Sequence, residues 1–302
     1  MKIGITTSVI QRGKTGIARW ILSVVESLLR HADEHEIHLF VLEEDLPLFE
    51  FARGTCQVHR VAEANRNPLR DIAWHQLELP RLARRLGLDV VHVPSYRRMP
   101  WKLPCASIVT VHDLAPFRLA GKYDFARMIY GRFAVRHLAR RQTHVTAVSS
   151  QTAADIQHFA GIDQESIDIL HNGVDRERFK PSRREEAKSR LGEFYDLSAP
   201  YFLYVARLEH PAKNHLNLLR AFESFRDETD VRRILVLAGQ DWTGSEMIHQ
   251  AIQSSKYAED IICTGFVPDN LLPSFYQAAD AVVFPSRFEG FGIPPIEAMA
   301  CG

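Results

Sequence analysis

The sequence predicts an α/β protein of two domains, each built on a parallel sheet covered by helices, with the second domain incomplete. Three observations lead to this prediction. The 302 residues are enough for two ordinary domains. Short apolar, β-branched runs alternate with amphipathic segments, which is the pattern of parallel strands joined by covering helices. This alternation stops in a charged segment after residue 175 and then begins again.

The first domain is expected to span residues 1–180. Its apolar runs are short and bounded by turn-forming residues, as strands are, whereas its longer segments repeat apolar residues at helical spacing. The predicted strands are Ile3–Val9, Ile37–Val41, Val58–Ala62, Val90–Val93, Ile108–His112, Val145–Val148 and Ile167–Leu170. The predicted helices are Gly16–Leu29, Asp71–Leu86, Tyr123–Arg140 and Ser150–Phe159.

A hinge between the domains is predicted at residues 181–200. It follows the tight turn His171–Asp175, is strongly charged, and has a proline at each end, Pro181 and Pro200. Exposed, polar segments with proline are where domain boundaries usually fall.

The second domain is expected to span residues 201–302. Its predicted strands and helices continue the same pattern, and Gly302 directly after an apolar helical turn is a C-cap signal, so another strand is expected to follow. We therefore expect this domain to be truncated. Its predicted strands are Tyr201–Ala206, Ile234–Ala238, Ile261–Thr264 and Ala281–Phe284, and its helices are Asn214–Phe225, Ser245–Ser254, Leu271–Ala278 and one starting at Pro295.

The composition is that of a soluble globular protein, with 46% hydrophobic and 25% charged residues. The net charge is zero, so nothing indicates a nucleic-acid partner. Residues 1–183 carry 26 Lys and Arg against 20 Asp and Glu (+6), which leaves 11 against 17 (−6) for residues 184–302. No apolar run has the roughly 20 residues that span a bilayer, and the four cysteines lack metal-ligand spacing. We expect a cytoplasmic protein whose membrane contact, if any, is peripheral.

The most informative segment is Phe284–Ala300. A strand is followed by a loop with two glycines and then by a helix whose first turn contains Pro295. The free amides at such a helix start form a site for a diphosphate. Glu289 in the loop and Glu297 in the helix are suited to accept hydrogen bonds from sugar hydroxyls. Taken alone, Glu297 could instead complement the helix dipole and Glu289 could be a solvated loop residue.

A second group of candidate residues follows the first strand of the same domain. Arg207 lies at the carboxyl end of the strand and Lys213 at the entry to the next helix, which is where ligands bind in open α/β sheets. Two cations at this place could neutralise the charge of a departing diphosphate. Ordinary surface charges are the alternative interpretation.

The first domain offers two weaker candidates. Gly16 belongs to the glycine-containing loop between the first strand and the first helix, so amides there could face a phosphate or an acceptor. His112 ends another strand, where its imidazole could bond a sugar hydroxyl. In the alternative interpretation His112 is satisfied by the neighbouring Asp113.

Two further patterns concern metals and membranes. The chain contains no Asp-x-Asp triplet, so an acidic clamp for a divalent metal beside a diphosphate is not expected. The segment Tyr123–Arg141 mixes apolar residues with Arg127, Arg132, Arg136, Arg140 and Arg141. Such a basic amphipathic helix can lie on anionic lipid, and equally it can cover a sheet with its basic face solvated.

Together these motifs resemble glycosyltransferase family 4 (GT4), whose GT-B architecture has two Rossmann-like domains. The resemblance covers essentially the whole chain. It is strongest at Phe284–Gly302, which is similar to the family's E-x7-E segment, and at Ala206–His215, which is similar to its Arg and Lys phosphate motif. The turn His171–Asp175 is similar to the Asn-Gly-Val-Asp turn that closes the family's first domain.

The resemblance implies roles for nine residues. Glu289 and His112 would be the catalytic residues, and the other seven would bind the donor. The diphosphate would be bound by Arg207, Lys213, Gly16, Gly292 and Ile293, and the sugar and ribose by Glu289, Phe291 and Glu297.

The resemblance also implies an activity. The enzyme would transfer a hexosyl group, with mannosyl favoured, from a nucleotide-sugar to a glycan or lipid-linked glycan in polysaccharide biosynthesis. Anomeric configuration would be retained, and neither a metal nor another cofactor would be needed. Same-face attack, with the leaving phosphate deprotonating the acceptor hydroxyl, is expected rather than a covalent Glu289 intermediate. A sugar-nucleotide 2-epimerase of the same fold and a non-catalytic nucleotide-sugar-binding fragment are the alternatives.

Overall fold

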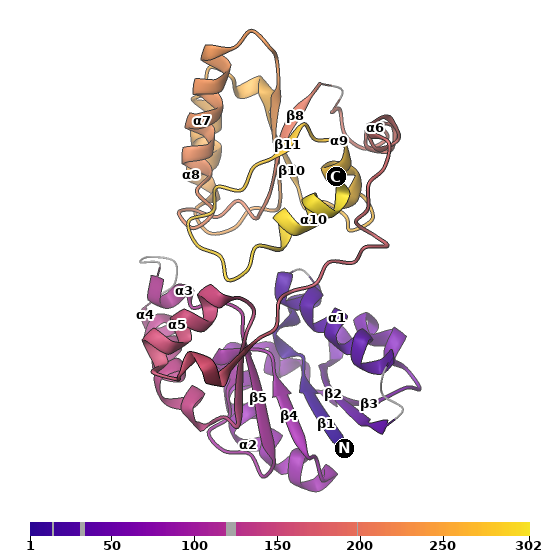
Figure 1. Cartoon of the computed structure of the whole chain (residues 1–302), viewed down its shortest axis with the longest axis vertical. Helices are drawn as coiled ribbons and strands as arrows, with labels where there is room; N and C mark the ends of the chain where they lie inside the picture. The colour runs from indigo at the N-terminus through magenta and orange to yellow at the C-terminus, as the bar shows by residue number, and fades with distance from the viewer. Residues whose placement is uncertain (14, 31–33, 119–124, 198) are drawn as a thin grey trace. The chain divides into compact units, whose positions relative to one another are not determined.

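The chain folds into two compact units, Met1–Gly173 and Val174–Gly302, each with its own sheet and core. The computed structural model is shown in Figure 1. The residues that it describes are 1–13, 15–30, 34–118, 125–197 and 199–302.

The first unit is built on seven parallel strands in the order β3-β2-β1-β4-β5-β6-β7. All seven predicted strands are confirmed, with ends shifted by at most three residues. The chain reverses its direction of progress across the sheet between β1 and β4, and ligands of open α/β sheets bind at the carboxyl edge beside such a reversal. The strands are β1 Lys2–Thr6, β2 Glu36–Leu42, β3 Gln57–Val61, β4 Val90–Val93, β5 Ala106–Val111, β6 His144–Ala147 and β7 Ile167–Ile169.

Helices cover both faces of this sheet (Figure 1). On one face, Ile21 and Val25 of α1 pack with Leu39 of β2 in a buried cluster. On the other face, Leu79 of α2 and Ile156 of α5 belong to a separate cluster. Because both faces are covered, a central strand such as β4 is mostly apolar and buried, whereas the edge strand β3 is mostly exposed. The helices are α1 Gly16–Arg30, α2 Pro68–Leu86, α3 Ala115–Arg118, α4 Phe125–Phe133 and α5 Ser150–Ala160.

The ends of α2 show how local sequence sets its bounds. The Asn67 side chain accepts hydrogen bonds from the backbone amides of Leu69 and Arg70, and Pro68 occupies the first helical position. At the other end Gly87 adopts a left-handed φ of 65°, a conformation that glycine takes without steric cost.

The single helix predicted at Tyr123–Arg140 is interrupted. After α4 the backbone forms a π-helical turn, Ala134–Leu138, and then a 3₁₀ turn, Ala139–Arg141. Tyr123 and Asp124 lie outside the described residues. Ala134, Val135 and Leu138 are buried in the sheet-covering core, so packing against the sheet rather than helical periodicity alone sets this backbone.

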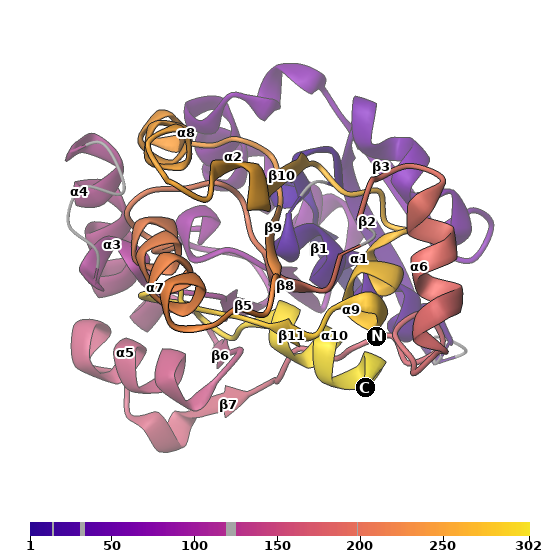
Figure 2. The ribbon, with the colours of Figure 1, turned by 90° about the horizontal axis from the view of Figure 1, so that it is seen from above.

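The second unit is built on four parallel strands in the order β10-β9-β8-β11. Figure 2 shows α7 and α8 on one side of this sheet and α6, α9 and α10 on the other. The predicted strands and helices of residues 201–302 are all present. The elements are α6 Arg184–Gly192, β8 Tyr201–Val205, α7 His215–Glu228, β9 Ile234–Ala238, α8 Ser245–Gln253, β10 Ile261–Gly265, α9 Leu272–Ala278, β11 Ala281–Val282 and α10 Ile293–Cys301.

The segment expected to be a hinge, residues 181–200, falls within the second unit, Val174–Gly302. It contains α6, whose Ala187 and Leu191 are fully buried and pack with Phe275 of α9. Arg184 also donates a hydrogen bond to the Ala278 carbonyl and pairs with Asp280. Burial and ion pairing thus anchor α6 in the second unit, and a hinge between the domains stays a prediction.

Candidate functional site

Lys213 and Glu289, which are 76 residues apart in sequence, form an ion pair in the second unit. The Lys213 Nζ and Glu289 Oε1 atoms are 2.5 Å apart, and both side chains are mostly shielded from solvent. The structure therefore brings together the lysine predicted to bind the diphosphate and the glutamate predicted to contact the sugar.

Hydrogen bonds join the two loops that carry this pair. The Tyr204 hydroxyl donates to the Lys213 carbonyl at 2.9 Å and lies 2.8 Å from the Ser286 hydroxyl. The Asn214 side-chain amide donates to the Pro285 carbonyl at 3.0 Å. Tyr204 of β8 thus contacts both loops, and the Asn214–Pro285 bond joins them directly, so the positions of Lys213 and Glu289 are coupled.

Burial raises the pKa of Tyr204 well above its usual range, so its hydroxyl stays a hydrogen-bond donor. Tyr204 is fully buried in β8 and packs its ring against His215, the first residue of α7. Neither Tyr204 nor Ser286 was predicted as a site residue. An aromatic residue in a buried strand has no sequence signal that separates a packing role from a loop-fixing one.

Arg207 is the second predicted cation of this site. Its Nη2 atom lies 3.1 Å from Glu209 Oε2, and its guanidinium lies over the Trp242 ring at 4.5 Å from the ring centroid. Glu209 and Trp242 were not predicted. Glu209 follows Arg207 at a spacing of two, which is unremarkable in a loop, and Trp242 comes from a different strand end.

The start of α10 is a partial anion site. Gly292 has a φ of 88° and precedes the helix, which begins at Ile293. The next two residues, Pro294 and Pro295, have no backbone N–H. Two of the usual orphan donors of a helix N-terminus are therefore missing, so an anion here would depend on amides such as those of Gly292 and Ile293. Phe291, the predicted sugar contact, lies half-buried directly before Gly292.

Glu297 is inside the second unit, with only 3% of its surface exposed. The Tyr276 hydroxyl of α9 donates to Glu297 Oε2 at 2.8 Å. This bond fixes the carboxylate against α9, and the predicted ribose contact of Glu297 remains a prediction.

In the first unit, His112 follows β5 directly and packs edge-on against Trp20 of α1, with ring centroids 4.8 Å apart. Burial lowers the pKa of His112 to about 4, so the imidazole is neutral at physiological pH. Asp113, the alternative partner considered for His112, accepts a hydrogen bond from the Ala115 amide at the start of α3.

A second histidine, His92 of β4, lies near His112 and was not predicted. Its ring packs edge-on against the same Trp20, and its Nε2 atom is 2.9 Å from the Thr110 hydroxyl. Thr110 in turn lies 2.8 Å from the Thr146 hydroxyl. Burial lowers the pKa of His92 to about 4. These contacts fix the side chains that lie near the carboxyl ends of β4 and β5.

Gly16 is the exposed first residue of α1. The neighbouring Thr15 hydroxyl accepts a hydrogen bond from the Ala18 amide at 3.2 Å, which caps the helix. Lys14, in the same predicted loop, lies outside the described residues.

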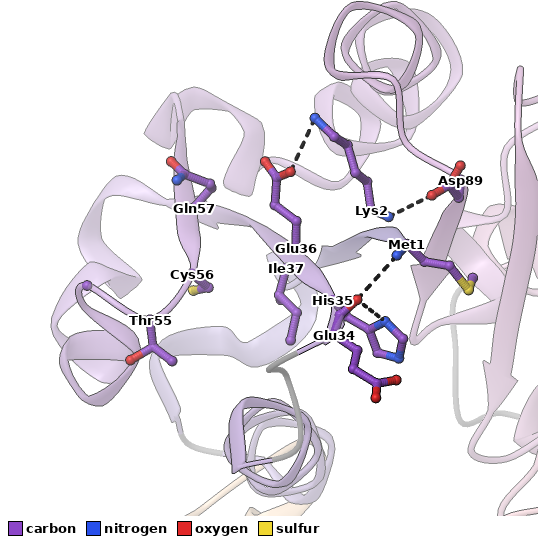
Figure 3. Close-up of a pocket in the computed structure, with 11 residues that line it drawn as sticks. Met1, Lys2, Glu34, His35, Glu36, Ile37, Thr55, Cys56, Gln57 and Asp89 are labelled. Carbon is purple, nitrogen blue, oxygen red and sulfur yellow. Dashed lines mark hydrogen bonds and ion pairs between the residues drawn. The ribbon is translucent and has the colours of Figure 1, made fainter.

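A polar pocket of about 600 Å³ lies elsewhere, at the amino ends of β1 and β2 (Figure 3). Lys2 pairs with Glu36 at 3.2 Å, and its backbone amide donates to Asp89 at 2.7 Å. None of the predicted site residues lines this pocket.

Across the described residues, no group of three or more His, Cys, Asp or Glu side chains is placed to hold a metal ion. Within the same residues, no helix is long and apolar enough to cross a membrane.

Comparison with known proteins matches both halves of the chain. Residues 14–178, more than half of the chain, match the family model described as Glycosyltransferase Family 4. Residues 187–302 match the model described as Glycosyl transferases group 1.

Two curated relatives are mannosyltransferases. O-antigen chain mannosyltransferase B of Escherichia coli is 27% identical over 311 residues, covering 100% of this chain and 81% of that protein. O-antigen chain mannosyltransferase RfbU of Salmonella typhimurium is 30% identical over 192 residues, covering 64% of this chain. The match spans 49% of RfbU, about half of that relative's length.

The fold is shared with solved glycosyltransferase structures. HepE of Anabaena, in complex with UDP and glucose, aligns with a TM-score of 0.73 at 19% identity, covering 100% of this chain and 78% of that chain. The strand order, the motif loops and the family match agree, and the chain belongs to glycosyltransferase family 4.

Proposed function

We propose that the protein transfers a hexosyl group, with mannosyl favoured, from a nucleotide-sugar to a glycan or lipid-linked glycan, with retention of anomeric configuration and without a metal. The observation that carries the proposal is the Lys213–Glu289 pair, held between the loop after β8 and the loop after β11. It places a cation suited to a phosphate beside a carboxylate suited to sugar hydroxyls.

Each of the two cations already has a carboxylate partner, Glu209 for Arg207 and Glu289 for Lys213. A diphosphate would compete with these carboxylates for the guanidinium and the ammonium. Once Lys213 turns to the diphosphate, Glu289 is free to accept hydrogen bonds from the donor sugar. The exchange would couple donor binding to sugar recognition in one step.

The mannosyl preference and the glycan acceptor are supported by the relatives named O-antigen chain mannosyltransferases. HepE, which shares the fold, is solved with UDP. The fold alone therefore does not indicate which nucleobase the donor of this protein carries.

We infer retention by same-face attack, in which the Glu289 carboxylate, released by Lys213, accepts hydrogen bonds from the donor sugar and forms no bond to its anomeric carbon. In the proposed step the acceptor oxygen bonds to the anomeric carbon as the bond to the diphosphate oxygen breaks. The acceptor proton passes to the leaving phosphate, whose charge Arg207 and Lys213 stabilise.

The substitution Glu289→Gln tests the site. We expect transfer from GDP-mannose to fall by about 10²-fold or more, because the charged acceptor of sugar hydroxyls is lost. Binding of GDP, measured by calorimetry, should be retained or tightened, because Lys213 loses its competing carboxylate. Glu228→Gln, at an exposed position at the end of α7, is the control. Loss of transfer together with loss of GDP binding would indicate a structural role and contradict the proposal.

Metal independence has its own test. We expect EDTA to leave the transfer rate unchanged, because Arg207 and Lys213 supply the positive charge that a divalent metal supplies in other enzymes. Transfer that stops in EDTA and returns with added Mg²⁺ or Mn²⁺ would overturn this part of the proposal.

We also propose that the protein is cytoplasmic and contacts an anionic membrane surface through the first unit. Ile129 and Phe133 of α4 are exposed beside the exposed Arg132 and Arg136. Apolar and basic side chains in one exposed segment suit the headgroup region of anionic lipid.

A further inference from the structure

The loops that follow β8 and β9 continue the parallel hydrogen bonding of the sheet beyond the carboxyl ends of these two strands. The Leu208 amide donates to the Gln240 carbonyl at 3.0 Å, and the Trp242 amide donates to the Leu208 carbonyl at 3.1 Å. The His210 amide then donates to the Thr243 carbonyl at 3.1 Å. Residues 206–210 and 239–243 therefore form a paired extension, which has the rigidity of a sheet rather than of a free loop.

Gly239 is needed where this extension begins. A Cβ atom built at Gly239 would lie 2.0 Å from the Ala206 carbonyl oxygen and 2.6 Å from its carbon. Since both are backbone atoms, any larger residue would force the two segments apart.

The extension holds Arg207 from two sides. Glu209, two residues further along an extended segment, lies on the same side as Arg207, and the two side chains pair at 3.1 Å. Trp242, from the other segment, lies under the guanidinium at 4.5 Å. Glu209 is 4% exposed and Trp242 is 42% exposed, so the carboxylate is buried and the indole is partly accessible to solvent.

The two partners act differently on Arg207. Glu209 neutralises the guanidinium and would compete with a phosphate for it. The indole attracts the guanidinium through its π face and leaves the N–H groups at the edge free to donate. A guanidinium stacked on an indole loses less side-chain freedom when it binds a phosphate than a solvated arginine does.

We propose that Trp242 is a positioning residue for the donor, which stacks on Arg207 and holds its guanidinium ready for the diphosphate while Glu209 pairs with the Arg207 Nη2 atom. This inference rests on the proposed function, since it needs the diphosphate to bind at Arg207. It assigns to Trp242 a role that acts through Arg207, not a direct contact with the donor base.

A double-mutant cycle separates these two roles. The dissociation constants of GDP and of inorganic pyrophosphate are measured by calorimetry for the wild type, Trp242→Ala, Arg207→Ala and the double variant. We expect Trp242→Ala to weaken both ligands about fivefold in the wild-type background, as expected for the loss of one cation–π contact. In the Arg207→Ala background the same change should have almost no effect.

Two variants guard against a merely structural effect. Trp242→Phe retains an aromatic face and should recover most of the affinity for both ligands. Trp101→Ala removes the matched pair in the first unit, where Arg141 lies 3.9 Å from the Trp101 ring centroid, and should leave GDP affinity unchanged.

Three results would overturn the inference. Additive effects of the two substitutions would mean that Trp242 does not act through Arg207. Weakened GDP binding with unchanged pyrophosphate binding would mean that Trp242 stacks on the base. In both cases the wild type still binds GDP, so the proposed function stands. A wild type that binds neither GDP nor UDP would overturn the proposed function and this inference together.

Discussion

At the scale of single residues, three histidines are neutral because the fold removes them from water. Burial lowers the pKa of His92, His112 and His215 to about 4. His215 is fully buried at the start of α7, and nearby Lys213 and His210 lower its pKa further. At neutral pH His112 can therefore act as a neutral hydrogen-bonding group and not as an imidazolium.

The buried His215 makes stability depend on pH. In the unfolded chain a histidine has a pKa near 6.5, whereas in the folded protein that of His215 is about 4. Between these values the unfolded chain binds a proton that the folded protein does not, so the free energy of unfolding falls as the pH drops below about 6.5. By pH 5.0 this single residue accounts for a loss of about 2 kcal/mol.

Urea unfolding at pH 7.5 and pH 5.0, for the wild type and for His215→Gln, measures this loss. The wild type should lose about 2 kcal/mol more than the variant over this interval. Equal losses in the two proteins would show that His215 is not held neutral.

The sequence identifies some residues of the candidate site and misses others for a physical reason. Arg207 and Lys213 stand at a strand end and a helix start, places that are set by the local pattern alone. Glu209 and Trp242 become partners of Arg207 only through the hydrogen bonds that pair the loops after β8 and β9. Such pairing between distant segments leaves no periodic signal in the sequence.

At the scale of elements, the strands are more predictable than the helices. Most strands contain a short apolar run, as in the fully buried β9, whereas β3 at the edge of the first sheet is mostly exposed. α6 was missed because its nine residues contain only Ala187 and Leu191 as buried positions, one helical turn apart. Its charged majority is typical of a linker, and only the surface offered by α9 makes it a packed helix.

In the segment from α4 to the 3₁₀ turn at Arg141, some arginines anchor the backbone and others are exposed. Arg140 donates to the Ala160 carbonyl at the end of α5, and Arg141 stacks on Trp101, which is 51% exposed. Arg132 and Arg136 are exposed, and the Arg132 guanidinium lies over the Phe117 ring at 5.7 Å from its centroid. The basic residues predicted as one membrane-facing set therefore divide into anchoring members and exposed members.

This division sharpens the membrane prediction. The double variant Arg132→Gln and Arg136→Gln should bind vesicles of phosphatidylcholine and phosphatidylglycerol about tenfold or more weakly than the wild type, at about 1 kcal/mol per basic residue. Arg140 is left intact because its loss would disturb α5. The control replaces Arg81 and Arg84 on the exposed face of α2 with Gln. Cosedimentation measures vesicle binding. Equal weakening in both double variants would mean that binding depends only on net charge, which would contradict a membrane-facing role of Arg132 and Arg136.

At the scale of the whole molecule, charge and packing are divided between the two halves of the chain. Residues 1–183 carry a net charge of +6 and residues 184–302 carry −6. The buried clusters on the two faces of the first sheet contain only residues of the first unit, and those of the second sheet only residues of the second. Each unit therefore has the packing needed to respond to a ligand by itself.

Nucleotide binding should consequently stabilise the two units unequally. A ligand that binds only the folded state adds RT ln(1 + [L]/Kd), about 2.7 kcal/mol at a concentration 100 times Kd. Because Arg207, Lys213 and Ile293 all belong to the second unit, amide hydrogen exchange in saturating GDP should slow across β8, α7 and the start of α10.

The first unit provides the internal control, and Gly16 provides a test of its predicted phosphate contact. Exchange in α2 and α5 should be unchanged by GDP, while slower exchange confined to the start of α1 would support a role for Gly16. Lys213→Gln should remove the protection of the second unit, since the ammonium that meets the diphosphate is lost. Protection that is equal in both units, or that survives in Lys213→Gln, would place the nucleotide elsewhere and contradict the donor site built on Lys213 and Glu289.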